Sequence, residues 1–187
     1  MRKPVIGVMG GGESASAEDC RLAYRLGALI AAEGWVLLNG GRNAGIMDAS
    51  ARGARERGGL TVGILPGAGT EQASRYIDIA IVTNMGGARN VINVLSSDII
   101  VAMAGKAGTI SEIALALKYK KPVILHCVSA YQEIIEIKKR LQVDVPMIIH
   151  GFSKNEQVAK SLLDNGFYLS FGKYLLRTPE LESVFAL

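Results

Sequence analysis

The sequence predicts an α/β fold, a Rossmann-like three-layer α/β/α sandwich around a mostly parallel sheet of about seven strands. Three observations predict it: short apolar runs recur along the chain, patterns of helical period separate most of them, and glycines cluster where several runs end. With 187 residues, 49% of them hydrophobic, the chain can bury one full core, so residues 1–187 are expected to form a single domain.

The candidate strands are apolar runs bounded by turn signals. In chain order they are Val5–Met9, Trp35–Leu38, Thr61–Leu65, Ile77–Val82, Ile99–Met103, Val123–His126, Met147–His150 and Tyr168–Ser170. Continuous runs such as VILHC and PMIIH are typical of strands that helices cover on both faces.

Capping signals mark the expected ends of helices between these strands. The N-cap signals are Ser16 with Asp19, Ser129 with Gln132 and Ser153 with Glu156, and the C-terminal ones are Gly34 and Gly166. Thr178-Pro179-Glu180 is typical of a last helix with proline at its first position.

The formal net charge of +4 permits anionic ligands without identifying one. Its densest basic cluster, Lys138-Lys139-Arg140, lies in a helical pattern whose apolar positions include Ile134 and Leu141. No aromatic residue is interleaved with the cluster, which favours a solvated helix face over a nucleic-acid patch. We therefore expect no nucleic-acid partner.

The two cysteines, Cys20 and Cys127, lie far apart in apolar surroundings and are expected to be buried reduced thiols. The opening MRKPVIGVMGGGES has one short apolar run followed by glycines, unlike a signal peptide or a membrane span. These features favour a cytoplasmic location and no membrane partner.

Three glycine clusters follow expected strands. They are Gly10, Gly11 and Gly12; Gly40 and Gly41 with Gly45; and Gly105 with Gly108. In an open parallel sheet, loops at the carboxyl ends of strands form the ligand crevice, and glycine lets backbone N–H groups approach a phosphate. Tight strand-to-helix turns also require glycine, so one cluster alone predicts little.

The segments 39–66, 87–117 and the opening IGVMGGGES together resemble the LONELY GUY family of nucleotide phosphoribohydrolases, with its lysine-decarboxylase-like and molybdenum-cofactor-carrier relatives. The resemblance covers about residues 4–120. It implies cleavage of the N-glycosidic bond of a nucleoside 5′-monophosphate, and LONELY GUY relatives form dimers or larger assemblies. The implied partner is a nucleoside monophosphate or another phosphate-bearing small molecule, and a homodimer is compatible with the resemblance.

That family's PGGxGTxxE signature, with an arginine upstream, corresponds here to residues 104–112 and Arg89. The resemblance implies that Arg89 and Glu112 are catalytic: the carboxylate would stabilise positive charge on the sugar, and the guanidinium would hold phosphate or sugar. Gly105, Gly108 and Thr109 would contact the phosphate, and Lys106 would either add a phosphate contact or fill the pocket.

A purely structural interpretation remains open for the same residues, because Thr109 and Glu112 also have the spacing of a capping box. Lys106 replaces the family's second glycine and Ala104 its proline, which puts catalysis in more doubt than binding. A nucleotide or molybdenum-cofactor-like binding protein without turnover, or an inert scaffold, is therefore the alternative.

Segments 121–140 and 145–185 resemble part of a TatD-type metal-dependent deoxyribonuclease, a TIM barrel. The resemblance implies metal ligands at His126 and His150, but these are the only two histidines, and the family's H-x-H pair, glutamate and aspartate have no counterparts. We therefore expect no metal and no cofactor. The metal-dependent nuclease remains the least favoured alternative.

The two resemblances meet near residues 118–124. The resulting prediction is a chimera, recombined or engineered, with a LONELY GUY-like part at 1–120 and a TatD-like segment at 121–187 that continues the same sheet. Its expected function is binding of a nucleotide phosphate, with at most residual phosphoribohydrolase activity.

Overall fold

The computed structural model describes residues 2–126, 131–142 and 144–172, together with 176, 179 and 181–185. Its strands are β1 (Val5–Met9), β2 (Val36–Asn39), β3 (Thr61–Leu65), β4 (Ile79–Val82), β5 (Ile99–Ala102), β6 (Val123–Leu125), β7 (Met147–His150) and β8 (Phe167–Ser170). Its helices are α1 (Ala17–Ala32), α2 (Gly45–Glu56), the 3₁₀ turn η1 (Gly86–Arg89), α3 (Asn90–Ser96), α4 (Ala107–Lys118), α5 (Tyr131–Leu141), α6 (Glu156–Leu163) and α7 (Leu181–Phe185).

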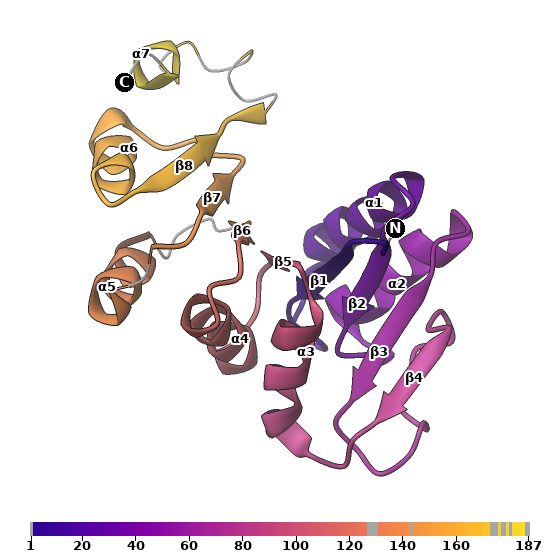
Figure 1. Cartoon of the computed structure of the whole chain (residues 1–187). Helices are drawn as coiled ribbons and strands as arrows, with labels where there is room; N and C mark the ends of the chain where they lie inside the picture. Colours follow the sequence, from indigo (N-terminus) through magenta and orange to yellow (C-terminus); the bar gives the residue numbers. More distant parts are fainter. Residues whose placement is uncertain are drawn as a thin grey trace.

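All eight strands belong to one sheet with the order β4-β3-β2-β1-β5-β6-β7-β8, and every pairing of these strands is parallel. The chain winds outward from β1 to β4, then returns to β5 on the other side of β1 and winds outward again to β8 (Figure 1). The switch between β1 and β5 leaves a crevice at the carboxyl ends of these strands, where open α/β sheets bind ligands.

Helices cover the two faces of the sheet in separate groups. Apolar residues of α1 and α2, among them Ala23, Ile30 and Ile46, pack with Ile6 and Val8 on one side, which we call the α1 face. On the opposite side, the α4 face, α3 to α6 pack with alternate residues of β5 to β8 in a second cluster. This is the three-layer α/β/α sandwich that the sequence predicts, with α1 and α2 apart from α3 to α6 in Figure 1.

The eight predicted runs correspond to the eight strands, shifted by one or two residues at several ends. The predicted capping box of Ser16 with Asp19 is present, and Gly34 and Gly166 lie just beyond the ends of α1 and α6. Ser153 does not cap α6, because the Asn155 side chain accepts the N–H of Val158 instead. Ser129, Cys127 and the start of the last predicted helix at Thr178 and Glu180 lie outside the described residues.

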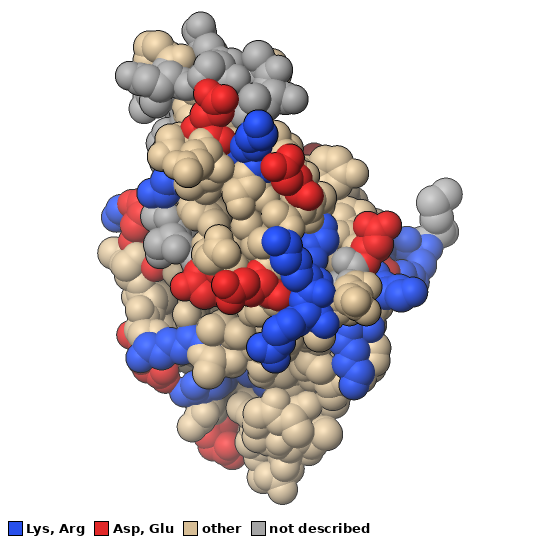
Figure 2. Space-filling view, turned by 90° about the vertical axis from the view of Figure 1, so that its left-hand side faces the viewer, with Lys and Arg blue, Asp and Glu red and all other residues tan. Residues whose placement is uncertain are grey.

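The basic cluster 138–140 is only partly a solvated helix face. Lys139 and Arg140 are exposed, but Lys138 is buried, and its Nζ donates to the carbonyl of Gly166 at 2.6 Å. Figure 2 shows basic and acidic side chains interspersed on the side of the molecule where α5 and α6 lie, so this face does not carry the single-sign charge of a nucleic-acid surface.

No helix among the described residues is long and apolar enough to cross a membrane. Cys20 is a free thiol and is half-buried in the cluster beneath α1, rather than fully buried as predicted.

Candidate functional site

A pocket of about 460 Å³ opens at the carboxyl ends of β1 and β5, at the switch point of the sheet. The loops after β1, β2 and β5 and the first turns of α3 and α4 surround it. Its lining residues are Val8, Met9, Gly10, Gly11, Gly12, Glu13, Ser14, Gly40, Arg42, Met47, Arg89, Asn90, Lys106, Gly108, Thr109 and Glu112.

Backbone contacts hold the glycine loops against one another. The Gly11 N–H donates to the carbonyl of Ala104 at 2.8 Å, and the Gly11 carbonyl accepts the N–H of Ile46 at 3.0 Å. Gly45 makes this arrangement possible, because its φ is +52° and a Cβ there would lie 2.0 Å from the Gly12 carbonyl oxygen. Gly45 therefore shapes the pocket without lining it.

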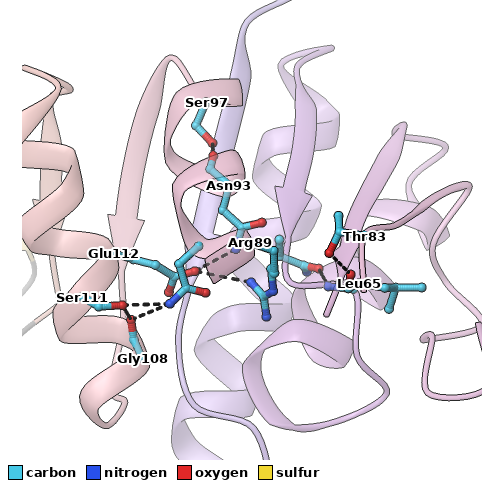
Figure 3. A network of polar contacts seen from close by, with 11 residues as sticks. Leu65, Thr83, Arg89, Asn93, Ser97, Gly108, Ser111 and Glu112 are labelled. Atoms are coloured by element: carbon cyan, nitrogen blue, oxygen red, sulfur yellow. Dashed lines mark hydrogen bonds and ion pairs between the residues drawn. The ribbon is translucent and has the colours of Figure 1, made fainter. Parts of the chain in front are cut away.

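A buried polar network crosses the pocket wall (Figure 3). Arg89, at the end of η1, and Glu112, on α4, form an ion pair with Nη1 and Oε1 3.6 Å apart, and their side chains are only 11% and 8% exposed. Asn93 on α3 donates from Nδ2 to the same Glu112 oxygen at 2.7 Å. Helices α3 and α4 thus jointly hold the carboxyl group in place.

Burial dominates the protonation of both charged groups. It raises the pKa of Glu112 above its usual value, although the Asn93 hydrogen bond and the Arg89 charge act in the opposite direction. Burial also lowers the pKa of Arg89, helped by the charge of Arg42, while Glu112 opposes it. A carboxyl group with a raised pKa can act as a proton donor nearer to neutral pH than a solvated one.

Arg42 brings a second guanidinium to the pocket from the loop after β2. Its Nη2 lies 2.6 Å from Oε1 of Glu13, which belongs to the loop after β1. The Nε atoms of Arg42 and Arg89 are both buried without a hydrogen-bond partner in the described structure. Each guanidinium therefore lines the pocket with one donor that the described protein atoms leave unused.

The N-terminus of α4 opens toward the pocket. Lys106 occupies the N-cap position and no side chain caps the helix, while Gly108 and Thr109 in its first turn line the pocket. Free N–H groups at a helix start attract anions. The capping-box interpretation of Thr109 with Glu112 is wrong, because both residues lie inside α4 and the Glu112 side chain bonds to Asn93.

Most predicted site residues meet at this one pocket. Those that line it are Arg89, Glu112, Gly10, Gly11, Gly12, Gly40, Lys106, Gly108 and Thr109. Gly41, Gly45 and Gly105 do not line the pocket. They allow the loops to pack closely: a Cβ on Gly105, for example, would lie 2.0 Å from Oγ1 of Thr109.

The sequence reasoning missed Arg42, Glu13 and Asn90. Arg42 directly follows the predicted Gly40-Gly41 pair, so a cation in a glycine-rich loop was the available signal. Asn90 donates to Oγ of Ser111 at 2.8 Å and so ties α3 to α4 beside the pocket. Gly40 has no side chain where the guanidinium of Arg89 lies, and a Cβ there would be 2.5 Å from Nη2.

The parallel sheet and its switch point define a Rossmann-like protein, and glycine loops and cationic side chains line the pocket at that point. A family model described as the SLOG cluster4 family matches residues 3–157, and the chain belongs to this family.

The molybdenum cofactor binding protein from Rippkaea orientalis is 51% identical in sequence, with a TM-score of 0.74 over 80% of this chain and 91% of that one. The molybdenum cofactor carrier protein from Chlamydomonas reinhardtii is 34% identical, with a TM-score of 0.68 over the whole of both chains. A cytokinin riboside 5′-monophosphate phosphoribohydrolase from Mycobacterium tuberculosis is 38% identical over 52% of this chain and 53% of its own length.

These matches correct the prediction of a chimera. The family model runs through residues 118–124, where the join was placed, and the carrier from Chlamydomonas reinhardtii aligns over the full chain. None of these matches supports a TatD-like segment, a TIM-barrel origin of the last βα units or an engineered join. The error has a physical cause, because a buried parallel strand followed by a helix has the same local pattern in barrels and in open sheets.

Proposed function

We propose that this protein binds a phosphate-bearing small molecule of the molybdenum-cofactor type in the pocket at the switch point. The observation that carries the proposal is the convergence of Arg42 and Arg89, each with an unpaired buried Nε, with Lys106 on the uncapped start of α4. Such a set of donors suits a phosphate, which accepts hydrogen bonds from several directions at once.

Binding without turnover is favoured over catalysis by the state of Glu112. Its Oε1 already accepts from Asn93 and faces Arg89, and the side chain is almost fully buried, so it is poorly placed to orient a water. The similarity to carrier proteins over their whole length supports the same choice, whereas the phosphoribohydrolases match over about half of theirs. The molybdenum cofactor, a pterin with a terminal phosphate, would be cargo here.

Hydrolysis of nucleoside 5′-monophosphates is the second candidate, and the Arg89–Glu112 pair is what favours it. In this reaction Glu112 would stabilise the positive charge that develops on the sugar, and Arg89 would hold the phosphate or sugar. Gly10, Gly11, Gly12 and Gly40 would then offer close backbone approach. The same pocket would serve both functions, so the assay has to separate binding from turnover.

Co-purification tests the first candidate. The chain is produced in cells that synthesise the cofactor, and bound molybdenum and the fluorescent oxidised pterin are quantified per protein. The proposal predicts that both co-purify with the wild-type chain, and that both fall sharply in Arg42→Met but not in the matched control Arg21→Met, a surface residue of α1. Equal and negligible contents in all three proteins would contradict it.

The proposal includes a homodimer formed through the open edge of the sheet. On edge strand β4, Ile79 and Ile81 are 47% and 43% exposed, and they share the α4 face with Val62 and Ile64 of β3. Exposed isoleucines in register on a strand are costly unless a partner covers them. Light scattering should give a dimer for the wild-type chain and a monomer for Ile79→Lys; a wild-type monomer would contradict this.

A further inference from the structure

The only two histidines of the chain, 24 positions apart in sequence, lie side by side in the structure. The ring centroids of His126 and His150 are 6.0 Å apart, and the rings are tilted by 42° to each other. Neither residue lines the switch-point pocket. Their proximity is therefore not explained by the proposed function.

The strand register produces this pairing. His150 ends β7 opposite Ser170, which ends β8, and Leu125 is opposite Ile149, so His126 comes one residue beyond β6 in line with His150. The N–H of His126 donates to the carbonyl of Ala102 at 2.8 Å, which continues the ladder to β5. The row His126, His150 and Ser170 thus crosses three neighbouring strands at the carboxyl edge of the sheet.

Side-chain alternation places this row on the α1 face. Leu125 and Ile149 belong to the core of the α4 face, so the residues after them point to the other side. On this face the cluster beneath α1 and α2 extends to Ile124 of β6, whereas Tyr168, on the same side of β8 as Ser170, is 63% exposed. In the structure His126 is half-buried and His150 is exposed.

We propose that His126 and His150 together bind one divalent transition-metal ion, with Cu²⁺ held more tightly than Zn²⁺. Imidazole nitrogen is a preferred ligand for both ions, and Cu²⁺ stands above Zn²⁺ in intrinsic affinity. With metal–nitrogen distances of about 2.0 Å, two imidazoles on a tetrahedral ion have centroids about 5 Å apart. The centroids of the present pair are 6.0 Å apart, so a bound ion would draw the two rings closer together by about 1 Å.

The surroundings of the pair include a hydroxyl group on β8 that can position one of the two rings. The Oγ of Ser170 lies 3.5 Å from Nδ1 of His150 and can orient that ring. Within the described residues no group of three or more His, Cys, Asp or Glu side chains is placed to hold a metal, so the two histidines leave coordination positions to water or an external ligand.

The test is titration of the untagged chain with CuCl₂ and, separately, ZnCl₂, read by calorimetry and by electron paramagnetic resonance of the copper. The expected result is one ion per chain and a copper spectrum with hyperfine structure from two nitrogens. Loss of an outer-shell partner already weakens metal binding about tenfold or more, so His126→Gln and His150→Gln should each cost at least that. Asn165→Ala, a change outside the pair, should bind like the wild type.

Two results would overturn the proposal. One is a wild-type chain that takes up no copper or zinc, or whose copper spectrum shows no histidine nitrogen. The other is undiminished binding in the double variant His126→Gln/His150→Gln, which would place the ion elsewhere. Should the variants unfold, acylation of the wild-type imidazoles with diethyl pyrocarbonate gives the same comparison, because the chain has no other histidine.

Discussion

Arg89 and Glu112 form an ion pair of which both partners are about nine-tenths buried, with 3.6 Å between Nη1 and Oε1. Arg89 lies at the end of η1 and Glu112 on α4. Asn93, on α3, donates a hydrogen bond to the same carboxyl group and helps to fix its position. The distance exceeds that of a hydrogen bond, so this pairing is mainly electrostatic. A buried pair of this kind costs desolvation energy and is weak evidence for a stabilising role, which points to a function in the pocket.

The pH dependence of stability should reveal the state of Glu112. Because its pKa is raised in the folded state, the favourable contribution of the protonated carboxyl is complete below the unfolded value near 4.5 and is lost as pH rises through the raised value. Glu112→Gln keeps the acceptor for Asn93 but cannot ionise. In urea unfolding from pH 4 to 7.5, the variant should therefore gain stability relative to the wild type as pH increases. If the variant instead lost stability relative to the wild type as pH increases, the charge of Arg89 would have a larger effect on the pKa of Glu112 than burial has.

Glu13 should compete with anionic ligands for Arg42. Its side chain is exposed, and a hydrogen bond from its own backbone together with the Arg42 charge keeps its pKa low, so it is ionised at neutral pH. Glu13→Gln removes this competitor and should tighten the binding of a phosphorylated ligand, whereas Arg42→Met should weaken it about tenfold, the equivalent of one charged hydrogen bond. Calorimetry measures both, with Glu18→Gln on α1 as the control. If the wild type and both variants bound the ligand with equal affinity, Arg42 would not contribute to the binding site.

Gly45 should be irreplaceable for two separable reasons. Alanine at a positive φ costs about 1 kcal/mol, and here a Cβ would also collide with the Gly12 carbonyl. Gly58→Ala is the matched control, since Gly58 has φ +73° and a Cβ there would meet no atom within 4 Å. In urea unfolding, Gly45→Ala should lose clearly more stability than Gly58→Ala and should also bind ligand less well. Equal losses would mean that the loop moves aside freely.

Lys106 should separate binding from hydrolysis. It stands where the LONELY GUY family has glycine, at the N-cap of α4 beside the pocket. Lys106→Gly removes a cation and opens the loop. Under the carrier proposal it should weaken ligand binding without producing ribose 5-phosphate from AMP. If the variant released more ribose 5-phosphate from AMP than the wild type, the phosphoribohydrolase function would be favoured instead.

The strands were predictable because each is a short apolar run with turn residues at both ends, and so was the crevice, because glycines follow β1, β2 and β5. The contacts of Arg42 with Glu13 and of Glu112 with Asn93 were not, since each joins residues from loops or helices that only the folded sheet brings together. The two histidines stand out in the sequence, but their adjacency depends on the register of β6 and β7. The assignment of residues 121–187 was wrong because βα units of barrels and open sheets share one local pattern.

We expect the dependence of binding on the ligand's phosphate to be the defining property of the switch-point pocket. The most direct test of this dependence is a thermal-shift titration with the phosphorylated pterin obtained by oxidising the molybdenum cofactor, compared with the same pterin after phosphatase treatment. We predict a saturable rise in melting temperature with the phosphorylated form only, and a much smaller rise in Arg42→Met. The same response to both forms, or none to either, would contradict the claim.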